Sequence, residues 1–173
     1  MSKISVLMSV YKKENPEYLR ASLESILVQT RTADEILLIE DGPLTQELYQ
    51  VVAEYQKKCD YLHVHAMEQN VQLGRALAKG VELCKYDLIA RMDTDDIAKP
   101  DRFEKQIRVF QEHPELDVVG AWIDEFEETT SNIISTRKLP EVHDDICQFA
   151  KKRNPENHPV IMFRKQAVLA AGG

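Results

Sequence analysis

The sequence predicts an α/β fold in which a mostly parallel central sheet carries helices on both faces. Short apolar runs rich in β-branched residues alternate along the chain with longer segments whose apolar residues recur at helical spacing. The longer segments have room for helices of about ten residues or more, as crossovers between parallel strands require. The length, 173 residues of which 43% are hydrophobic, suits one globular domain with one core.

Four strand–helix units follow one another from the N-terminus. The predicted strands are residues 4–10, 36–39, 62–66 and 88–92. The apolar stripes of the four predicted helices are Leu19, Leu23, Ile26 and Leu27; Leu44, Leu48, Val51, Val52 and Tyr55; Leu73, Leu77, Val81 and Cys84; and Phe103, Ile107 and Phe110. Asn15 as N-cap and Pro16 as first helical residue predict where the first helix begins. Asp101 and Glu104 predict a capping box at the start of the fourth.

The alternation weakens after residues 118–123. There we predict an antiparallel or irregular strand at residues 133–138, a helix at 144–151 and a returning strand at 160–164. No internal repeat or linker indicates a second domain. Because ligands of open parallel sheets bind at the carboxyl ends of the strands, the loops of interest are residues 11–15, 40–44, 69–75 and 93–101.

Composition excludes several classes of partner. The chain has 22 basic and 29 acidic residues, a net charge of -7, and its basic residues are scattered. We therefore expect neither nucleic acid nor an anionic membrane surface as the main partner. No apolar run approaches the ~20 residues of a spanning helix, and no signal peptide is evident, so a cytoplasmic location is expected. Cys59, Cys84 and Cys147 are too far apart for a C-x-x-C pair and are expected to be reduced thiols.

The loops exclude two common modes of nucleotide binding. A dinucleotide-binding fold needs glycines in its first strand-to-helix turn, and residues 11–15 contain none. A phosphate-binding G-x-x-x-x-G-K-[ST] loop is also absent from the sequence. Phosphates must therefore be held in another way.

The segment Asp93-Thr94-Asp95-Asp96 supplies that alternative, because it places three carboxylates directly after a predicted strand. Crowded carboxylates raise one another's pKa unless a cation neutralises them. Such oxygen ligands favour Mg²⁺ or Mn²⁺, with a substrate's phosphates completing the coordination. A single aspartate here would more simply be a turn residue. Ile97 and Ala98 match a calcium-binding EF-hand loop poorly, and Ser9-Val10-Tyr11 stands where a haloacid dehalogenase-type phosphatase needs its nucleophile.

Three further residues are candidates for nucleotide contacts. Asp41, in Glu40-Asp41-Gly42 after the second strand, can accept hydrogen bonds from a ribose or base edge, or can be a turn residue. Tyr11 can stack on a base or be a half-buried structural tyrosine. Arg75, at the start of the third helix, can meet a phosphate or base or be a surface arginine.

Five segments stand in a characteristic order: residues 6–12 (V-L-M-S-V-Y-K), 25–30 (S-I-L-V-Q-T), 36–42 (I-L-L-I-E-D-G), 70–74 (N-V-Q-L-G) and 92–102 (M-D-T-D-D-I-A-K-P-D-R). Together they resemble the successive motifs of family 2 glycosyltransferases. The later His158-Pro159, Phe163-Arg164 and Gly172-Gly173 resemble that family's H-P and G-G segments. The resemblance spans essentially the whole chain.

The resemblance implies a Rossmann-like GT-A fold for residues 1–173 and an inverting transfer of a sugar from a nucleoside diphosphate to an acceptor hydroxyl. A UDP-sugar donor, a saccharide or lipid-linked acceptor, a Mn²⁺ or Mg²⁺ cofactor and a role in bacterial cell-surface polysaccharide synthesis follow as expectations. The residues it assigns are Ser9, Tyr11 and Asp41 to the base pocket, Asp93 and Asp95 to the metal, Asp96 to the donor sugar or its phosphates, and, less closely matched, Arg75 to the nucleotide. Glu40 replaces the first of the family's two aspartates.

The same resemblance places the general base in an E-D motif downstream of Gly173. We therefore expect these residues to be the donor-binding portion of a longer enzyme, bound at most peripherally to the inner face of the membrane, and the isolated chain to be weakly active or inactive. His158, Asp144 and Asp145 are the substitute bases within the chain. A metal-dependent nucleotidyltransferase or a non-catalytic nucleotide-sugar-binding module remain alternatives, although no glycine-rich N-terminal loop with a basic residue supports the first.

Overall fold

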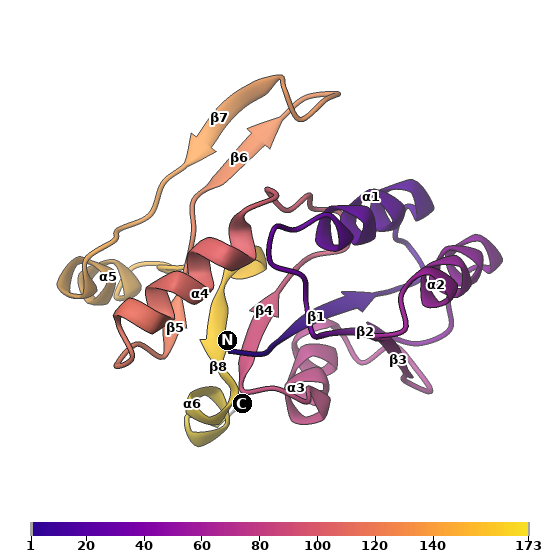
Figure 1. Cartoon of the computed structure of the whole chain (residues 1–173), viewed down its shortest axis with the longest axis horizontal. Helices are drawn as coiled ribbons and strands as arrows, with labels where there is room; N and C mark the ends of the chain where they lie inside the picture. Colours follow the sequence, from indigo (N-terminus) through magenta and orange to yellow (C-terminus); the bar gives the residue numbers. More distant parts are fainter. Residues whose placement is uncertain (1, 173) are drawn as a thin grey trace.

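A computed structural model describes residues 2–172 and contains the predicted mostly parallel sheet (Figure 1). Its six strands lie in the order β3-β2-β1-β4-β8-β5. They are β1 (Ile4–Val10), β2 (Glu35–Glu40), β3 (Leu62–Ala66), β4 (Leu88–Arg91), β5 (Val118–Val119) and β8 (Met162–Arg164). β1 pairs in parallel with β2 and β4, and β2 with β3, whereas β8 runs antiparallel to β4 and β5. The predicted fold class is confirmed.

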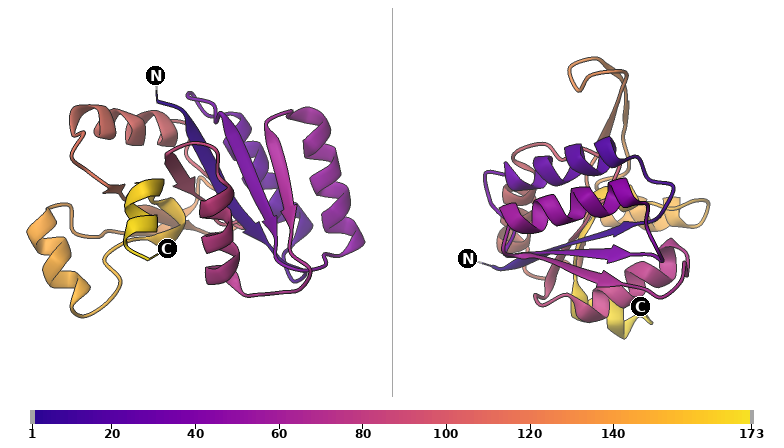
Figure 2. Two further views of the ribbon diagram at one scale, coloured as in Figure 1. Left: turned by 90° about the horizontal axis from the view of Figure 1, so that it is seen from below. Right: turned by 90° about the vertical axis from the view of Figure 1, so that its right-hand side faces the viewer.

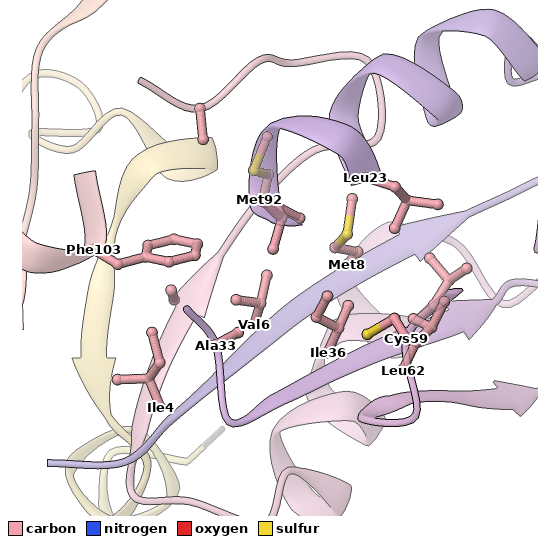
Figure 3. Close-up of a cluster of buried hydrophobic side chains, with 14 of the residues drawn as sticks. Ile4, Val6, Met8, Leu23, Ala33, Ile36, Cys59, Leu62, Met92 and Phe103 are labelled. Carbon is pink, nitrogen blue, oxygen red and sulfur yellow. The ribbon is translucent and has the colours of Figure 1, made fainter. Parts of the chain in front are cut away.

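Helices cover both faces of the sheet (Figure 2). They are α1 (Pro16–Leu27), α2 (Gln46–Lys58), α3 (Leu73–Leu83), α4 (Arg102–Glu112) and α6 (Lys165–Ala170), whereas α5 (His143–Ala150) has no buried residue and lies apart from the sheet. Side chains of a strand alternate between faces, so β1 contributes Val6 and Met8 to the core under α1, α2 and α4, and Leu7 to the core under α3. Figure 3 shows Met8 beside Leu23 of α1, with Val6 farther along the strand toward Phe103 of α4. The two cores fix the sheet between its helices.

The predicted helix starts had different outcomes. Asn15 caps α1 as expected, because its Oδ1 accepts a hydrogen bond from the amide of Glu17 at 2.9 Å. The capping box of α4 was wrong, since Asp101 makes no side-chain cap. The carboxylate of Asp101 instead pairs with Lys105 Nζ at 2.6 Å, and Glu104 accepts from Thr30 Oγ1 at 2.8 Å. The carboxylates of Asp101 and Glu104 therefore contact Lys105 and Thr30 instead of the amides at the start of α4.

The second half of the chain departs from the regular alternation as predicted. Residues 118–123 divide into β5 and the start of β6 (Ile123–Phe126), and β6 pairs antiparallel with β7 (Ile133–Arg137) as a separate two-stranded sheet. This hairpin projects away from the main sheet in Figures 1 and 2. The predicted returning strand begins later than expected, because a short 3₁₀ turn, His158–Val160, precedes β8. Among residues 2–172, no helix combines the length and apolar character needed to cross a membrane.

Candidate functional site

A cavity of about 440 Å³ lies where the carboxyl ends of β1, β2 and β4 meet. It is lined by Ser9, Tyr11, Glu14, Asp41, Asn70, Gln72, Leu73, Asp93, Thr94 and Asp95. Apart from Ser9, which lies in β1, these residues come from the four loops expected to carry the chemistry, and each loop contributes at least one. The structure therefore brings Ser9, Tyr11, Asp41, Asp93 and Asp95 to one place, as the strand-end rule predicts. Arg75 is exposed in the first turn of α3 and does not line this cavity.

Three carboxylates gather at one edge of this cavity. Asp93, Asp95 and Asp96 each offer an oxygen, and these oxygens lie within 4.8 Å of one another. Burial, followed by the negative charges of Asp93 and Asp95, raises the pKa of Asp96 to about 6. The cluster has the hard oxygen donors that Mg²⁺ and Mn²⁺ prefer. Asp93 also pairs with Arg91, whose Nη2 lies 2.5 Å from Asp93 Oδ1.

Crowding at this cluster predicts that removing the charge of Asp96 stabilises the metal-free protein. Folding raises the pKa of Asp96 from 3.8 to about 6. The folded protein therefore loses stability as pH rises through this range, because the carboxyl group must give up its proton in a crowded, partly buried place. Asp96→Asn removes that cost, which is about 1 kcal/mol after allowance for solvent screening. We expect its Tm at pH 7.5 to rise by about 2–4 °C, and by less at pH 5. Differential scanning calorimetry without metal checks this, with the exposed Asp60→Asn as control; an unchanged or lower Tm would contradict it.

The loop that carries the carboxylates is held by polar side chains of α1 and the residues after it. Ser22 Oγ donates to the carbonyl oxygen of Asp93 at 3.0 Å, and Ser25 Oγ accepts from the amide of Ala98 at 3.0 Å. Gln29 Nε2 donates to the carbonyl oxygen of Lys99 at 2.7 Å. Ser25 and Gln29 belong to the S-I-L-V-Q-T segment, which therefore supports the aspartate loop and gives a physical reason for the two motifs to occur together.

Asp41 holds a second loop in place. It is 4% exposed, its Oδ1 accepts from the amide of Val71 at 2.7 Å, and its Oδ2 accepts from Asn70 Nδ2 at 2.9 Å. The carboxylate therefore fixes the segment that leads into α3 while lining the cavity. Glu40 is also buried, and burial raises its pKa, but it does not line the cavity.

Gly42, next to Asp41, occupies a position that only glycine accommodates. Its φ is +83°, and a Cβ built there would lie 2.6 Å from the amide nitrogen of Asn70. We expect Gly42→Ala to lower the free energy of unfolding by about 1–3 kcal/mol. Gly74→Ala is the matched control, because a Cβ at Gly74 in α3 meets nothing within 4 Å. Urea denaturation checks both variants, and equal stabilities would contradict the close approach.

Five lining residues were not singled out from the sequence: Glu14, Asn70, Gln72, Leu73 and Thr94. Thr94 is buried, and its Oγ1 donates to Glu14 Oε2, which joins the first loop to the aspartate loop. Gln72 has φ +73°, an uncommon conformation for a residue other than glycine. All five follow predicted strands, and this position was the signal that the sequence offered for them. Which side chains they contact depends on the fold.

The substitute bases do not line this cavity, although His158 is near enough to Asp93 for that carboxylate to act on its pKa. Asp144 and Asp145 are exposed on α5, and His158 lines a different cavity together with Arg91. None of the three is among the residues lining the cavity that contains Asp93 and Asp95.

Comparisons with known proteins agree with this architecture. Residues 5–169 match the family described as Glycosyl transferase family 2. The amylovoran biosynthesis glycosyltransferase AmsE of Erwinia amylovora is 45% identical over 168 residues, which cover 97% of this chain and 62% of that protein. An Escherichia coli UDP-Gal:alpha-D-GlcNAc-diphosphoundecaprenol beta-1,3-galactosyltransferase is 34% identical over 173 residues, with 99% and 62% covered. This chain thus spans less than two thirds of the length of either relative.

A solved structure shares the fold at low sequence identity. It is the mannosyltransferase PcManGT from Pyrobaculum calidifontis in complex with GDP-Man and Mn²⁺, with a TM-score of 0.72, 12% identity, and coverage of 99% of this chain and 47% of that one. The GT-A fold expected from the sequence motifs is confirmed by this likeness. On the family match over residues 5–169, the chain belongs to glycosyltransferase family 2.

Proposed function

We propose that this chain is the donor-binding portion of an inverting glycosyltransferase that transfers a sugar, a hexose in our expectation, from a nucleoside diphosphate to an acceptor hydroxyl. The observation that carries the proposal is the acidic cluster, whose oxygens lie within 4.8 Å of one another at the edge of a 440 Å³ cavity. UDP is the proposed nucleotide, because the E. coli relative is described as using UDP-Gal. Bacterial cell-surface polysaccharide synthesis is the proposed context, since amylovoran synthesis is the described role of AmsE.

Each end of the cavity has a proposed part in donor binding. Ser9 and Tyr11, a residue that is 44% exposed, contact the base, and Asp41 holds the adjoining loop and faces the same moiety. Asp93 and Asp95 hold Mn²⁺ or Mg²⁺, which when bound supplies positive charge to the departing diphosphate. Asp96 lies near the donor sugar or its phosphates, and Arg75 at the start of α3 is the remaining candidate for a nucleotide contact.

We place the general base outside residues 1–173, in the part that the longer relatives have in addition. The chain covers 62% of AmsE and of the galactosyltransferase. The isolated chain is therefore expected to bind donor but to transfer sugar weakly or not at all. The acceptor is a saccharide or a lipid-linked saccharide, as the name of the E. coli relative describes for that enzyme. A lipid-linked acceptor would place the protein at the cytoplasmic face of the membrane, and no nucleic-acid partner is proposed.

Isothermal titration calorimetry with UDP, GDP and ADP, each with and without Mn²⁺, tests the donor site. We expect Mn²⁺ to strengthen binding of one nucleoside diphosphate by at least about tenfold, because an ion held by the carboxylates would supply positive charge to the phosphates. Equal affinity with and without the ion would contradict the proposed function. The same experiment identifies the base that the cavity prefers.

A further inference from the structure

Gln72 has a backbone conformation that residues other than glycine almost never adopt. Its φ is +73° and its ψ is 154°, which lies in a region of backbone space populated essentially by glycine alone. A side chain crowds the backbone there, so the folded protein keeps Gln72 at a cost in stability. Strained residues of this kind cluster at ligand-binding sites, which makes Gln72 a candidate for function.

The structure on either side of Gln72 holds this conformation in place. Before it, Asp41 accepts hydrogen bonds from Asn70 Nδ2 at 2.9 Å and from the amide of Val71 at 2.7 Å. After it, the carbonyl oxygen of Gln72 accepts from the amide of Ala76 at 3.1 Å, in the first turn of α3. The chain is thus fixed on both sides, and the turn between the two fixed parts falls on Gln72.

A structural role does not account for a glutamine at this position. Gln72 is the N-cap residue of α3, but within residues 2–172 its side chain makes no capping hydrogen bond to that helix. Glycine would make the same turn without crowding, because it has no Cβ. Gln72 is exposed and lines the cavity of about 440 Å³ that contains Asp93 and Asp95, which we call the donor cavity. It therefore brings to the wall of the donor cavity a side chain that does not cap the helix.

The order of the strands places Gln72 on the side of the donor cavity away from the acidic cluster. Neighbouring strands follow the order β3, β2, β1 and β4 (Figure 1). The loops after these four strands carry, respectively, Gln72, Asp41, Tyr11 and the acidic cluster. In the proposed function the cluster holds the diphosphate through a metal, so the base of the nucleotide extends toward Asp41 and Gln72.

We propose that Gln72 is a further residue that recognises the base of the donor nucleotide, and that its strained backbone is the cost of presenting its amide group there. The carboxamide has a carbonyl acceptor and two N–H donors, which match the donors and acceptors along the edge of a nucleobase. This assignment rests on the proposed function, because it takes a nucleoside diphosphate as the ligand of the donor cavity.

Two variants separate recognition of the base from backbone strain. Gln72→Gly removes both the amide group and the strain, so its Tm without ligand should rise by about 2–4 °C while its affinity for UDP with Mn²⁺ falls by about fivefold or more. Gln72→Leu removes the amide group but keeps a side chain at the same backbone angles, so its affinity should fall by a similar factor without the rise in Tm. Gln69→Leu is the matched control, because Gln69 is an exposed glutamine of the same loop that does not line the donor cavity.

The test is calorimetric titration, with Mn²⁺, of UDP and of inorganic pyrophosphate, which carries two phosphates without the base. Both variants at position 72 should bind UDP more weakly and pyrophosphate within about threefold of the unaltered chain. An equal loss for pyrophosphate would place Gln72 at the phosphates and overturn the assignment. Unchanged UDP affinity in both variants, or a loss in Gln72→Gly alone, would also overturn it, because the second result attributes the loss to a loosened loop.

An NMR titration of the unaltered ¹⁵N-labelled chain gives a readout that needs no variant. The side-chain amide resonances of Gln72 should shift on addition of UDP with Mg²⁺ and move far less with pyrophosphate and Mg²⁺. Resonances that stay unmoved while UDP binds would overturn the assignment and leave the proposed function standing. Absence of metal-dependent binding of UDP, GDP and ADP would instead overturn the proposed function and the assignment with it.

Discussion

Asp95→Ala is expected to abolish Mn²⁺-dependent binding of a nucleoside diphosphate, with a loss of affinity of about 100-fold or more. Asp95 is the exposed member of the acidic cluster and lines the donor cavity, so its oxygens reach an ion most freely. Removing it leaves Asp93, which already pairs with Arg91, and the more enclosed Asp96. Calorimetric titration of UDP with Mn²⁺ measures the effect.

The matched control for this experiment is Asp60→Ala. Asp60 is exposed in the connection between α2 and β3 and does not line the donor cavity, so its replacement should leave the affinity unchanged. Circular dichroism should show that both variants remain folded. Retention of Mn²⁺-dependent affinity within about threefold in Asp95→Ala would remove Asp95 from the metal site.

Asp41→Ala is expected to lower the free energy of unfolding by about 2–4 kcal/mol and to weaken nucleotide binding with it. Its carboxylate is buried and accepts from the amide of Val71 and from Asn70 Nδ2, so alanine leaves both donors unpaired. The freed loop includes Gln72 and Leu73 of the cavity wall. Urea denaturation measures the free energy of unfolding, and calorimetry measures the affinity for the nucleotide.

Two further variants sharpen this result. Asp41→Asn can still accept from Val71 but presents an amide group to Asn70, so an intermediate loss is expected. Asp101→Ala removes an aspartate that pairs with the exposed Lys105, and surface pairs contribute only about 0–1 kcal/mol. A loss for Asp41→Ala no larger than that for Asp101→Ala would show that the loop does not depend on Asp41.

Much of the fold follows from local patterns. Apolar runs and helical stripes predict the first four strand–helix units because each helix buries one face, and each strand one or both faces, in the two cores of the fold. The insertion of β8 between β4 and β5 has no local signal, because the pairing joins Val118 to Phe163 and Leu88 to Arg164. The capping box at Asp101 failed for a similar reason, since Lys105 and Thr30 compete for its carboxylates.

The candidate site also has features that the sequence predicts and features that it does not. The rule that ligands bind where parallel strands end predicts which loops meet, and the clustering of Asp93, Asp95 and Asp96 follows from adjacency in sequence. The bond from Thr94 to Glu14 joins residues 80 positions apart, so the sequence alone gives no sign of it.

A crystal structure of the chain grown with MnCl₂ and UDP, with anomalous diffraction to locate manganese, tests directly whether these aspartates bind a metal. We expect an anomalous peak coordinated by carboxylate oxygens of Asp93 and Asp95, with oxygens of the diphosphate on the same ion and the base against Tyr11. An ordered UDP bound elsewhere, or manganese absent from this cluster while UDP is bound, would contradict the proposal that these aspartates hold the donor through a metal.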